Sequence, residues 1–287
     1  MDRLDRIVGA MAATALSPQA QRVQTRFRLD LVDTWNIRPG DSVLEIGCGQ
    51  GDTTAVLADA VGAHGSVLGV DTAPQDYGAP VTLAESAAQL ARSPLGKQIT
   101  MRFEFDVLDH CFPADSFDHV VMSHCSWYFA SLGRLRQTLR HVRPWARQLC
   151  FAEWDLQMDR REQLPHLLAV LTQGHVEAAG SRGSGNVRTP HSRQTALRVI
   201  SDAGWEPVTQ RTLDTAGLPD ADWEIDACFR ILAMPSRMQG IPEPVAELIK
   251  SQADALRVIG GQRGNATLPS YSVTAPRAAS GDPENHE

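Results

Sequence analysis

Short apolar runs alternate with amphipathic segments through the first half of the chain. The runs are rich in Val, Ile, Leu and Phe, and each ends at a polar residue or a glycine. Short apolar runs with such ends are typical of buried parallel strands. Alternation of strand and helix from residue 42 to about 155 predicts an α/β fold with a doubly wound, mostly parallel sheet. The strands predicted in this region span 43–46, 66–70, 99–105, 117–123 and 148–153.

The flanking segments carry helical patterns and two more strands. Residues 1–37 are predicted to be helical, with an apolar stripe at Val23, Phe27, Leu31 and Trp35. Prolines within the last predicted strand restrict it to a sheet edge, or else lie at its ends. The later helices are predicted over 160–180, 190–204, 221–233 and 242–258, and the later strands over 205–213 and 267–276.

We therefore expect a seven-stranded sheet with helical lid insertions. The expected parts are an N-terminal helical cap (1–37), a cofactor-binding core (38–155), a lid helix followed by a helix and strand that complete the core (156–213), a helical insertion over the substrate site (214–266), the last strand (267–278) and a disordered tail (279–287).

The charge balance argues against a nucleic-acid partner. The 287 residues carry a net charge of −7, whereas nucleic-acid binding depends on neutralising phosphates. One segment without acidic residues, 119–152, carries arginines at helical spacing, which favours a solvated helix face over a docking patch for an anionic partner. These arginines are Arg134, Arg136, Arg140, Arg143 and Arg147.

Cysteine usage and the start of the chain indicate a cytoplasmic protein. The five cysteines form no C-x-x-C pair and their number is odd, which favours a reducing compartment. Asp2, Arg3, Asp5 and Arg6 sum to zero charge, unlike the positive start of a signal peptide. No stretch is long enough to span a membrane, and the histidines show no metal-ligand spacing. We expect no membrane, no metal, and a monomer or homodimer.

Three glycines follow the first predicted strand at alternate positions, as Gly47, Gly49 and Gly51. Without Cβ atoms they allow a ligand to approach the backbone closely, and a helix starting near Asp52 presents free N–H groups to it. The nicotinamide fingerprint G-x-G-x-x-G requires its third glycine at position 52, where this chain has Asp52. Glu45 before the loop suits a ligand with a cationic end.

The segment Glu45-Ile-Gly47-Cys-Gly49-Gln-Gly51 resembles the first motif of the class I S-adenosylmethionine-dependent methyltransferases. Asp71 lies where this family places a carboxylate on the ribose hydroxyls, Asp106 matches its contact to the adenine amino group, and the end of strand 117–123 lies beside the methionine part of the cofactor. The resemblance covers roughly residues 30–155. It departs after Asp71, where prolines and glycine delay the next helix until near Thr82.

The resemblance implies a Rossmann-like methyltransferase fold with S-adenosyl-L-methionine as cofactor and S-adenosyl-L-homocysteine as product. The residues that it assigns to the cofactor are Glu45, Gly47, Cys48, Gly49, Gly51, Asp71, Thr72, Asp106, Val107 and Ser123.

Methyl transfer to a hydroxyl requires removal of a proton, and His124 is the candidate base. It follows Ser123 directly after the fourth strand, and activity would rise through a pKa near 6.5 if the imidazole were unperturbed. Alternatively, His124 only hydrogen-bonds a loop. Trp127 and Tyr128 either wall a planar substrate or pack under the arginine-rich helix.

Trp154, His175 and Trp223 are further substrate candidates, with surface or structural roles as the alternative. The family's enzymes that methylate nucleobase nitrogens carry an Asn/Asp-Pro-Pro-aromatic tetrad after the fourth strand. This chain has Ser123-His124-Cys125-Ser126 there, which argues against that subclass.

We therefore interpret the chain as a methyltransferase that acts on a small organic acceptor, with a hydroxyl as the favoured acceptor group. Two alternatives remain open. One is a non-methylating enzyme that uses the same cofactor fold, such as a cyclase. The other is a cofactor-binding regulatory protein without turnover.

Overall fold

A seven-stranded sheet forms the centre of the protein. The computed structural model describes residues 2–180, 187–260 and 264–278, so the expected disordered tail lies outside the described residues. The strands are β1 (Ser42–Ile46), β2 (Ser66–Val70), β3 (Ile99–Arg102), β4 (Phe117–Ser123), β5 (Ala146–Trp154), β6 (Thr209–Leu213) and β7 (Ser270–Pro276). Their order is β3-β2-β1-β4-β5-β7-β6, with β1 to β5 parallel and β7 antiparallel to both of its neighbours. This confirms the expected α/β class with a mostly parallel sheet.

Three strands are shorter than the sequence predicts, and one of them is β7, which begins at Ser270 instead of residue 267. β3 ends at Arg102 instead of residue 105, since Glu104 adopts a φ of 53° that extended chains do not sustain. β6 begins only at Thr209, although the N–H groups of Glu206 and Val208 already donate to the carbonyls of Pro276 and Thr274. Trp205, expected to start this strand, makes only an isolated bridge to Arg277.

The last strand lies inside the sheet and not at its edge. β7 pairs with β5 from Trp154↔Ser270 to Gln148↔Pro276 and with β6 on its other side. Its prolines lie at the ends of the strand, which is one of the two arrangements that the sequence allowed. Pro269 precedes the strand and Pro276 is its last residue. The interior of β7 therefore retains every N–H that the two ladders need.

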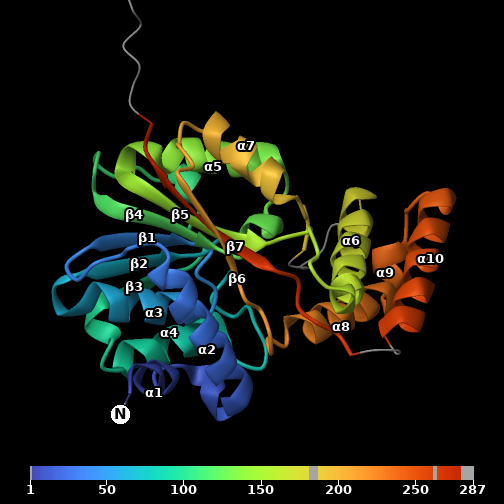
Figure 1. Cartoon of the computed structure of the whole chain (residues 1–287), viewed down its shortest axis with the longest axis horizontal. Coiled ribbons are helices and arrows are strands. Elements are labelled where there is room, and N and C mark those ends of the chain that lie inside the picture. Colours follow the sequence, from blue (N-terminus) through green and yellow to red (C-terminus); the bar gives the residue numbers. More distant parts are fainter. Residues whose placement is uncertain (1, 181–186, 261–263, 279–287) are drawn as a thin grey trace, which may run out of the picture.

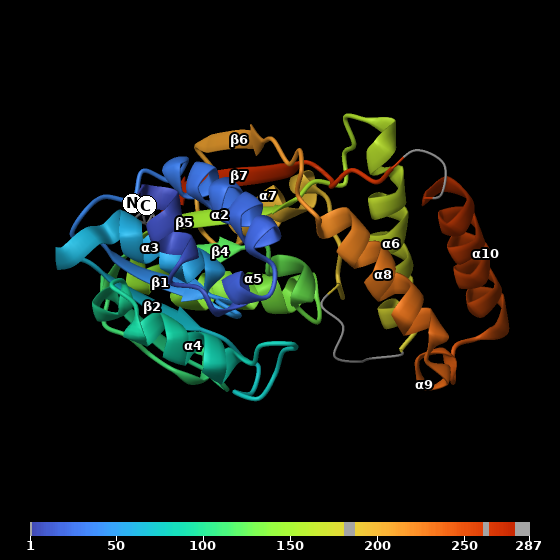
Figure 2. The same ribbon diagram turned by 90° about the horizontal axis from the view of Figure 1, so that it is seen from below.

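Helices cover both faces of the sheet, and a further group is set apart. Figures 1 and 2 show α2, α3 and α4 on one face, α5 and α7 on the other, and α6, α8, α9 and α10 together at one end. In this last group α6 packs against both α8 and α10. The helices are α1 (Arg3–Val8), α2 (Pro18–Asp33), α3 (Asp52–Val61), α4 (Leu83–Arg92), α5 (Leu132–Val142), α6 (Leu164–Ala178), α7 (Arg193–Asp202), α8 (Asp220–Ala233), α9 (Pro235–Met238) and α10 (Glu243–Gly260).

Local sequence explains where helices begin. Thr82 and Glu85 form a reciprocal capping box at the start of α4, as the delayed helix predicts. α7 begins at Arg193 and not at Pro190, because the Ser192 side chain accepts a hydrogen bond from the backbone N–H of Thr195 and caps the helix. The N-terminal segment is also not one helix, since a short 3₁₀ turn and Pro18 separate α1 from α2.

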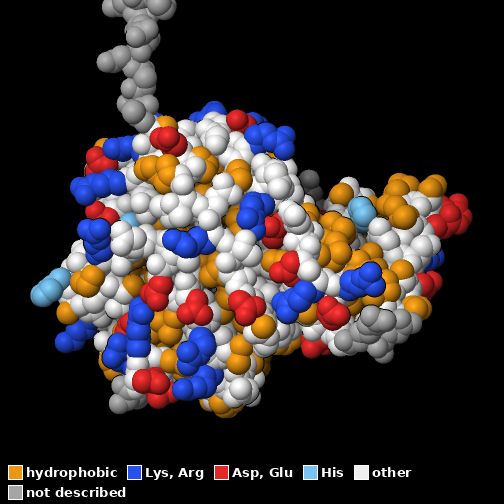
Figure 3. Space-filling view, in the orientation of Figure 1, with side chains coloured by type: hydrophobic (Ala, Val, Ile, Leu, Met, Phe, Trp, Pro, Cys, Tyr) orange, Lys and Arg blue, Asp and Glu red, His pale blue; other side chains and the backbone are white. Residues whose placement is uncertain are grey.

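Arginines between residues 134 and 147 bind carboxylates and a backbone carbonyl of neighbouring segments. Arg136 and Arg147 pair with Asp202 and Asp118, and Arg143 donates to the carbonyl of Gly204. These contacts tie α5 and the start of β5 to neighbouring segments, as a solvated structural face does. Figure 3 shows basic and acidic side chains interspersed over the face that it displays.

Candidate active site

The three glycines after β1 all have left-handed φ angles, for different reasons. A Cβ on Gly47 would lie 2.7 Å from Cβ of Cys125, and one on Gly51 would lie 2.5 Å from Cδ1 of Leu90. Those two glycines are therefore required for packing. A Cβ on Gly49 (φ 51°) would meet nothing within 4 Å. Gly49 is thus the position in the loop that faces open space.

Asp71 holds this loop in place from the end of β2. One carboxylate oxygen accepts a hydrogen bond from the backbone N–H of Gly49 at 2.9 Å, and the other accepts from the N–H of Ala73 at 2.9 Å. Thr72 between them is exposed. Each carboxylate oxygen has lone pairs left for a further donor.

Glu45 and Cys48 are both buried beneath the loop. The Glu45 carboxyl accepts a hydrogen bond from the hydroxyl of Thr54 on α3. Burial raises its pKa to about 8, although Thr54 and the charge of Arg28 oppose the shift. The group is therefore mostly protonated at neutral pH. The Cys48 side chain lies beside Gly69 of β2, and burial raises the pKa of its thiol.

Asp106 follows β3 and is already occupied by the protein. One carboxylate oxygen accepts from the N–H of Leu108 at 3.0 Å, and the other pairs with Arg134 of α5. Val107 is buried next to it. A ligand that bonded to Asp106 would therefore share this carboxylate with Arg134.

The end of β4 places His124 among aromatic rings. The backbone of His124 has a φ of 50°, and its N–H donates to the carbonyl of Ala152 at 2.9 Å. Its ring lies 4.4 Å from the Trp154 ring and 5.6 Å from the Phe27 ring. Phe27 of α2 stacks on Trp154 with an interplanar angle of 15°. The structure thus brings Ser123, His124 and Trp154 together, with α2 as their cover.

The imidazole of His124 does not titrate near its ordinary pKa. Its two nitrogens lie 3.2 Å from Oγ of Ser123 and 2.9 Å from Oγ of Ser270. Burial and, to a smaller extent, the positive charge of Arg28 lower its pKa to about 3. The condition of an unperturbed imidazole is therefore not met, and a rise of activity through pH 6.5 is not expected from His124.

Two of the predicted substrate residues are engaged within the protein. Trp127 is only 1% exposed and packs in a cluster with Val170, Val187 and Leu268, and the partly buried Trp154 packs against the same cluster. His175 hydrogen-bonds Gln252 at 3.0 Å, which joins α6 to α10. Sequence periodicity could not reveal these long-range partners.

The other two aromatic candidates are accessible. Tyr128 is 43% exposed directly after the turn that follows β4, and Trp223 is 46% exposed in the first turn of α8. Burial of the hydroxyl and the nearby charge of Glu224 raise the pKa of Tyr128. Neither Tyr128 nor Trp223 has a ring contact to His124 or Trp154 within the described part of the chain.

Glu153 supports the turn after β4 from the neighbouring strand. Its carboxylate accepts hydrogen bonds from the N–H and hydroxyl of Ser126 and from the N–H groups of Trp127 and Trp154, at 2.7 to 3.2 Å. Burial raises its pKa to about 7, and these donors oppose the shift. Because its oxygens are committed to the backbone, Glu153 shapes the site without facing it.

Sequence reasoning missed an incompletely paired cation, Arg28, at the seam between α2 and α8. Nη1 of Arg28 is buried without a hydrogen-bond partner, and its Nη2 lies 4.0 Å from a carboxylate oxygen of Asp52. Asp220 of α8 has one buried unpartnered oxygen, and Gln24 of α2 hydrogen-bonds its side chain. The four-residue spacing of Gln24 and Arg28 places them on one helix face, but no sequence signal places α8 opposite.

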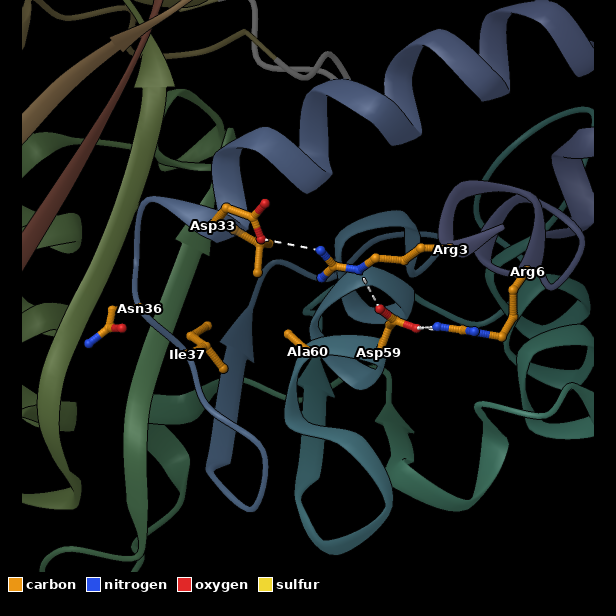
Figure 4. A pocket seen from close by; sticks show the side chains of 8 residues that line it. Arg3, Arg6, Asp33, Asn36, Ile37, Asp59 and Ala60 are labelled. Carbon is orange, nitrogen blue, oxygen red and sulfur yellow. Dashed lines mark hydrogen bonds and ion pairs between the residues drawn. The ribbon is translucent and has the colours of Figure 1, made fainter. Parts of the chain in front are cut away.

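A separate pocket of about 470 Å³ lies at the other edge of the sheet, near the amino end of β1. Figure 4 shows Arg3 and Arg6 directed toward Asp59, with Asp33 bonded to Arg3. Both arginines are thus already paired. These ion pairs attach α1 to α3, so the pocket has a structural explanation and lies away from the glycine loop.

Neither a metal cluster nor a membrane span is found in the described ranges. Within 2–180, 187–260 and 264–278, no three His, Cys, Asp or Glu side chains gather where they could hold a metal ion. None of the helices in these same ranges is both long and apolar enough to cross a membrane.

Known proteins are similar to this chain in fold and, at about one third identity, in sequence. A model of a methyltransferase domain matches residues 43–148. The crystal structure of a cyclopropane-fatty-acyl-phospholipid synthase-like protein from Lactobacillus casei is 32% identical with a TM-score of 0.85, and the match covers 96% of this chain and 98% of that one.

Two curated relatives are matched over part of their length. Methyltransferase phomM' of Diaporthe leptostromiformis is 29% identical over 254 residues, covering 77% of this chain and 60% of its own. Nocamycin O-methyltransferase of Saccharothrix syringae is 37% identical over 131 residues, covering 46% and 41%. The chain thus spans less than two thirds of either relative.

Proposed function

We propose that this chain, which belongs to the class I S-adenosylmethionine-dependent methyltransferases, transfers a methyl group to a hydroxyl of a small organic acceptor. The observation that carries the proposal is the open, left-handed Gly49 clamped by Asp71, one strand away from the neutral His124 at the end of β4. The cofactor supplies an electrophilic methyl group on a sulfonium. The residues of the chain bind it, orient the acceptor and exclude water.

The loop region fits this cofactor on two grounds. The space beside Gly49 is free of protein atoms where a Cβ would stand, so a ligand can contact the backbone there. Arg28 offers a buried guanidinium nitrogen without a partner, and such a group costs free energy unless an anion pairs with it. We assign the carboxylate of the methionine end to Arg28 and the ribose hydroxyls to Asp71.

The remaining cofactor assignments are also proposals. Asp106, held by Arg134 and Leu108, has the acceptor oxygens that an adenine amino group needs, and Val107 supplies an apolar wall. Ser123 lies at the end of β4, between the loop and His124. Glu45 acts from beneath the loop, where it is bonded to Thr54.

The acceptor is placed against His124 and Trp154, under α2 and the helices α6 and α8. Trp154 offers a flat apolar surface, and Phe27 closes it from α2. Exclusion of water by these helices strengthens each polar contact. Alignment of acceptor and methyl group accounts for roughly 7–11 kcal/mol of barrier lowering in well-oriented reactions.

A neutral imidazole suits a hydroxyl acceptor. His124 remains unprotonated at neutral pH, so a ring nitrogen can accept a hydrogen bond from an acceptor hydroxyl that replaces one of its serine contacts, and this bond orients the oxygen lone pair. The Saccharothrix syringae relative is named an O-methyltransferase, which also supports a hydroxyl as the acceptor group.

We place this activity in the cytoplasm, with a small molecule as partner. The five cysteines are free and four of them are buried, which supports a reducing compartment. The negative net charge does not favour binding to nucleic acid.

The proposal is tested with S-adenosylmethionine labelled in its methyl group and panels of phenols, enols, amines, thiols and carbon acids. Label recovered as an ether, identified by NMR of the product, is the expected result. Label found on nitrogen, sulfur or carbon alone would overturn the hydroxyl assignment. No transfer despite tight cofactor binding would overturn the transfer activity and favour a cyclase or a binding protein.

A further inference from the structure

His124 lies between two serines from distant parts of the chain. Its Nδ1 lies 3.2 Å from Oγ of Ser123, the preceding residue on β4. Its Nε2 lies 2.9 Å from Oγ of Ser270, the first residue of β7. Ser270 is completely buried, and its hydroxyl also lies 3.2 Å from the backbone carbonyl of Glu153.

These contacts distinguish the two tautomers of a neutral ring. A carbonyl only accepts hydrogen bonds, and a serine hydroxyl has a single proton to donate. If Ser270 donates to the carbonyl of Glu153, it must accept from His124, whose Nε2 then carries the proton. In this arrangement Ser123 donates to Nδ1, and three hydrogen bonds form.

The other tautomer forms fewer bonds. With the proton on Nδ1, His124 donates to Ser123, and Ser270 must donate to Nε2. The contact between Ser270 and the carbonyl of Glu153 is then lost, and two hydrogen bonds remain. One additional hydrogen bond of ordinary strength favours the first tautomer by roughly fivefold.

We propose that Ser270 is a positioning residue that fixes His124 as the Nε2–H tautomer and leaves the Nδ1 lone pair, beside Ser123, as the acceptor nitrogen of the site. The role of that lone pair in methyl transfer rests on the proposed function, whereas the tautomer itself does not. Within this assignment an acceptor hydroxyl either displaces the Ser123 hydroxyl from Nδ1 or donates to Oγ of Ser123.

The antiparallel last strand makes this arrangement possible. The register pairs Trp154 with Ser270, so the start of β7 lies at the edge where the parallel strands end. Ser272, two residues further along the same strand, is also buried, and its hydroxyl is hydrogen-bonded to that of Thr34 at 2.9 Å. It has the same chemistry on the same strand without contact to His124, which makes it a matched control.

The test is long-range ¹H–¹⁵N NMR of the full chain labelled at histidine nitrogens, which distinguishes Nε2–H from Nδ1–H rings. A His124→Gln variant assigns the signal. We expect His124 to be the Nε2–H tautomer in the wild type, in Ser270→Thr, which retains the hydroxyl, and in Ser272→Ala. In Ser270→Ala the ratio of Nε2–H to Nδ1–H rings should fall at least twofold, toward equal populations.

Two results would overturn the proposal: an Nδ1–H ring in the wild type, or an unchanged tautomer in folded Ser270→Ala. The wild-type spectrum decides the first point even if the alanine variant fails to fold. Titration of each variant with S-adenosylhomocysteine provides a separate readout, which should be unchanged in Ser270→Ala. Failure of methyl transfer would contradict the proposed function and leave the tautomer result intact.

Discussion

The carboxylate of Asp71 accepts a hydrogen bond from the backbone N–H of Gly49 at 2.9 Å and so links the end of β2 to the glycine loop after β1. Its second oxygen bonds the N–H of Ala73. Asp71 therefore has two roles in this account: it holds the loop in its left-handed conformation, and its remaining lone pairs receive the ribose hydroxyls.

Replacement of Asp71 by alanine should remove both roles. Hydrogen bonds to a charged group contribute about 1.5–3 kcal/mol each, so affinity for S-adenosylhomocysteine should fall at least tenfold, measured by calorimetry. Asp76→Ala, on an exposed neighbouring position with the same charge change, serves as the control. Unchanged affinity in folded Asp71→Ala would refute its place in the site.

The glycines at 49 and 51 should respond differently to substitution. Gly49→Val should abolish binding of S-adenosylhomocysteine, because the added side chain fills the open space of the loop, and should cost about 1–2 kcal/mol of stability for a left-handed φ. Gly51→Ala should instead mainly lower the melting temperature, since its Cβ would lie 2.5 Å from Leu90. Normal affinity in Gly49→Val would show that the loop does not contact the ligand.

Arg28 should recognise the amino-acid end of the cofactor. Arg28→Gln should weaken S-adenosylhomocysteine at least tenfold, since the pairing of guanidinium and carboxylate is lost. It should leave 5′-methylthioadenosine, which shares the nucleoside but lacks the carboxylate, within twofold of wild type. Arg26→Gln, exposed on the same helix, is the control. Equal losses for both ligands would assign Arg28 a structural role.

The activity should not depend on pH through His124. Burial lowers the pKa of this imidazole from 6.5 to about 3, so the neutral form persists from pH 8 down to pH 5. With a pKa of 6.5, only roughly 3% would remain neutral at pH 5. His124→Ala should lower kcat at least tenfold, with the exposed His64→Ala as control. A wild-type kcat that falls steeply below pH 6.5 and loses this dependence in His124→Ala would contradict the lowered pKa.

The first half of the fold follows from local sequence signals. Glu45 and the alternate glycines mark the first strand and its loop, and the Thr82–Glu85 capping box marks the delayed start of α4. Such signals are local, since caps and strand ends depend on residues within a few positions.

The features that the sequence did not reveal depend on contacts between distant segments. Ser270 meets His124 only because β7 inserts between β5 and β6, and the prolines at its ends allowed an edge position equally well. Arg28 could not be recognised as a site residue, because the burial of its Nη1 without a hydrogen-bond partner depends on how distant segments pack around α2. The sequence left Trp127 open between a substrate wall and structural packing, and its burial against Val170 and Leu268 depends on segments more than 40 residues away.

The account's central claim is that this chain binds the methyl-donor cofactor at the loop around Gly49. Titration calorimetry of the purified chain with S-adenosylhomocysteine and, separately, with NAD tests it most directly. We predict saturable binding of S-adenosylhomocysteine with a stoichiometry of one per chain and no heat of binding for NAD. Tight binding of NAD with none for S-adenosylhomocysteine would contradict the account.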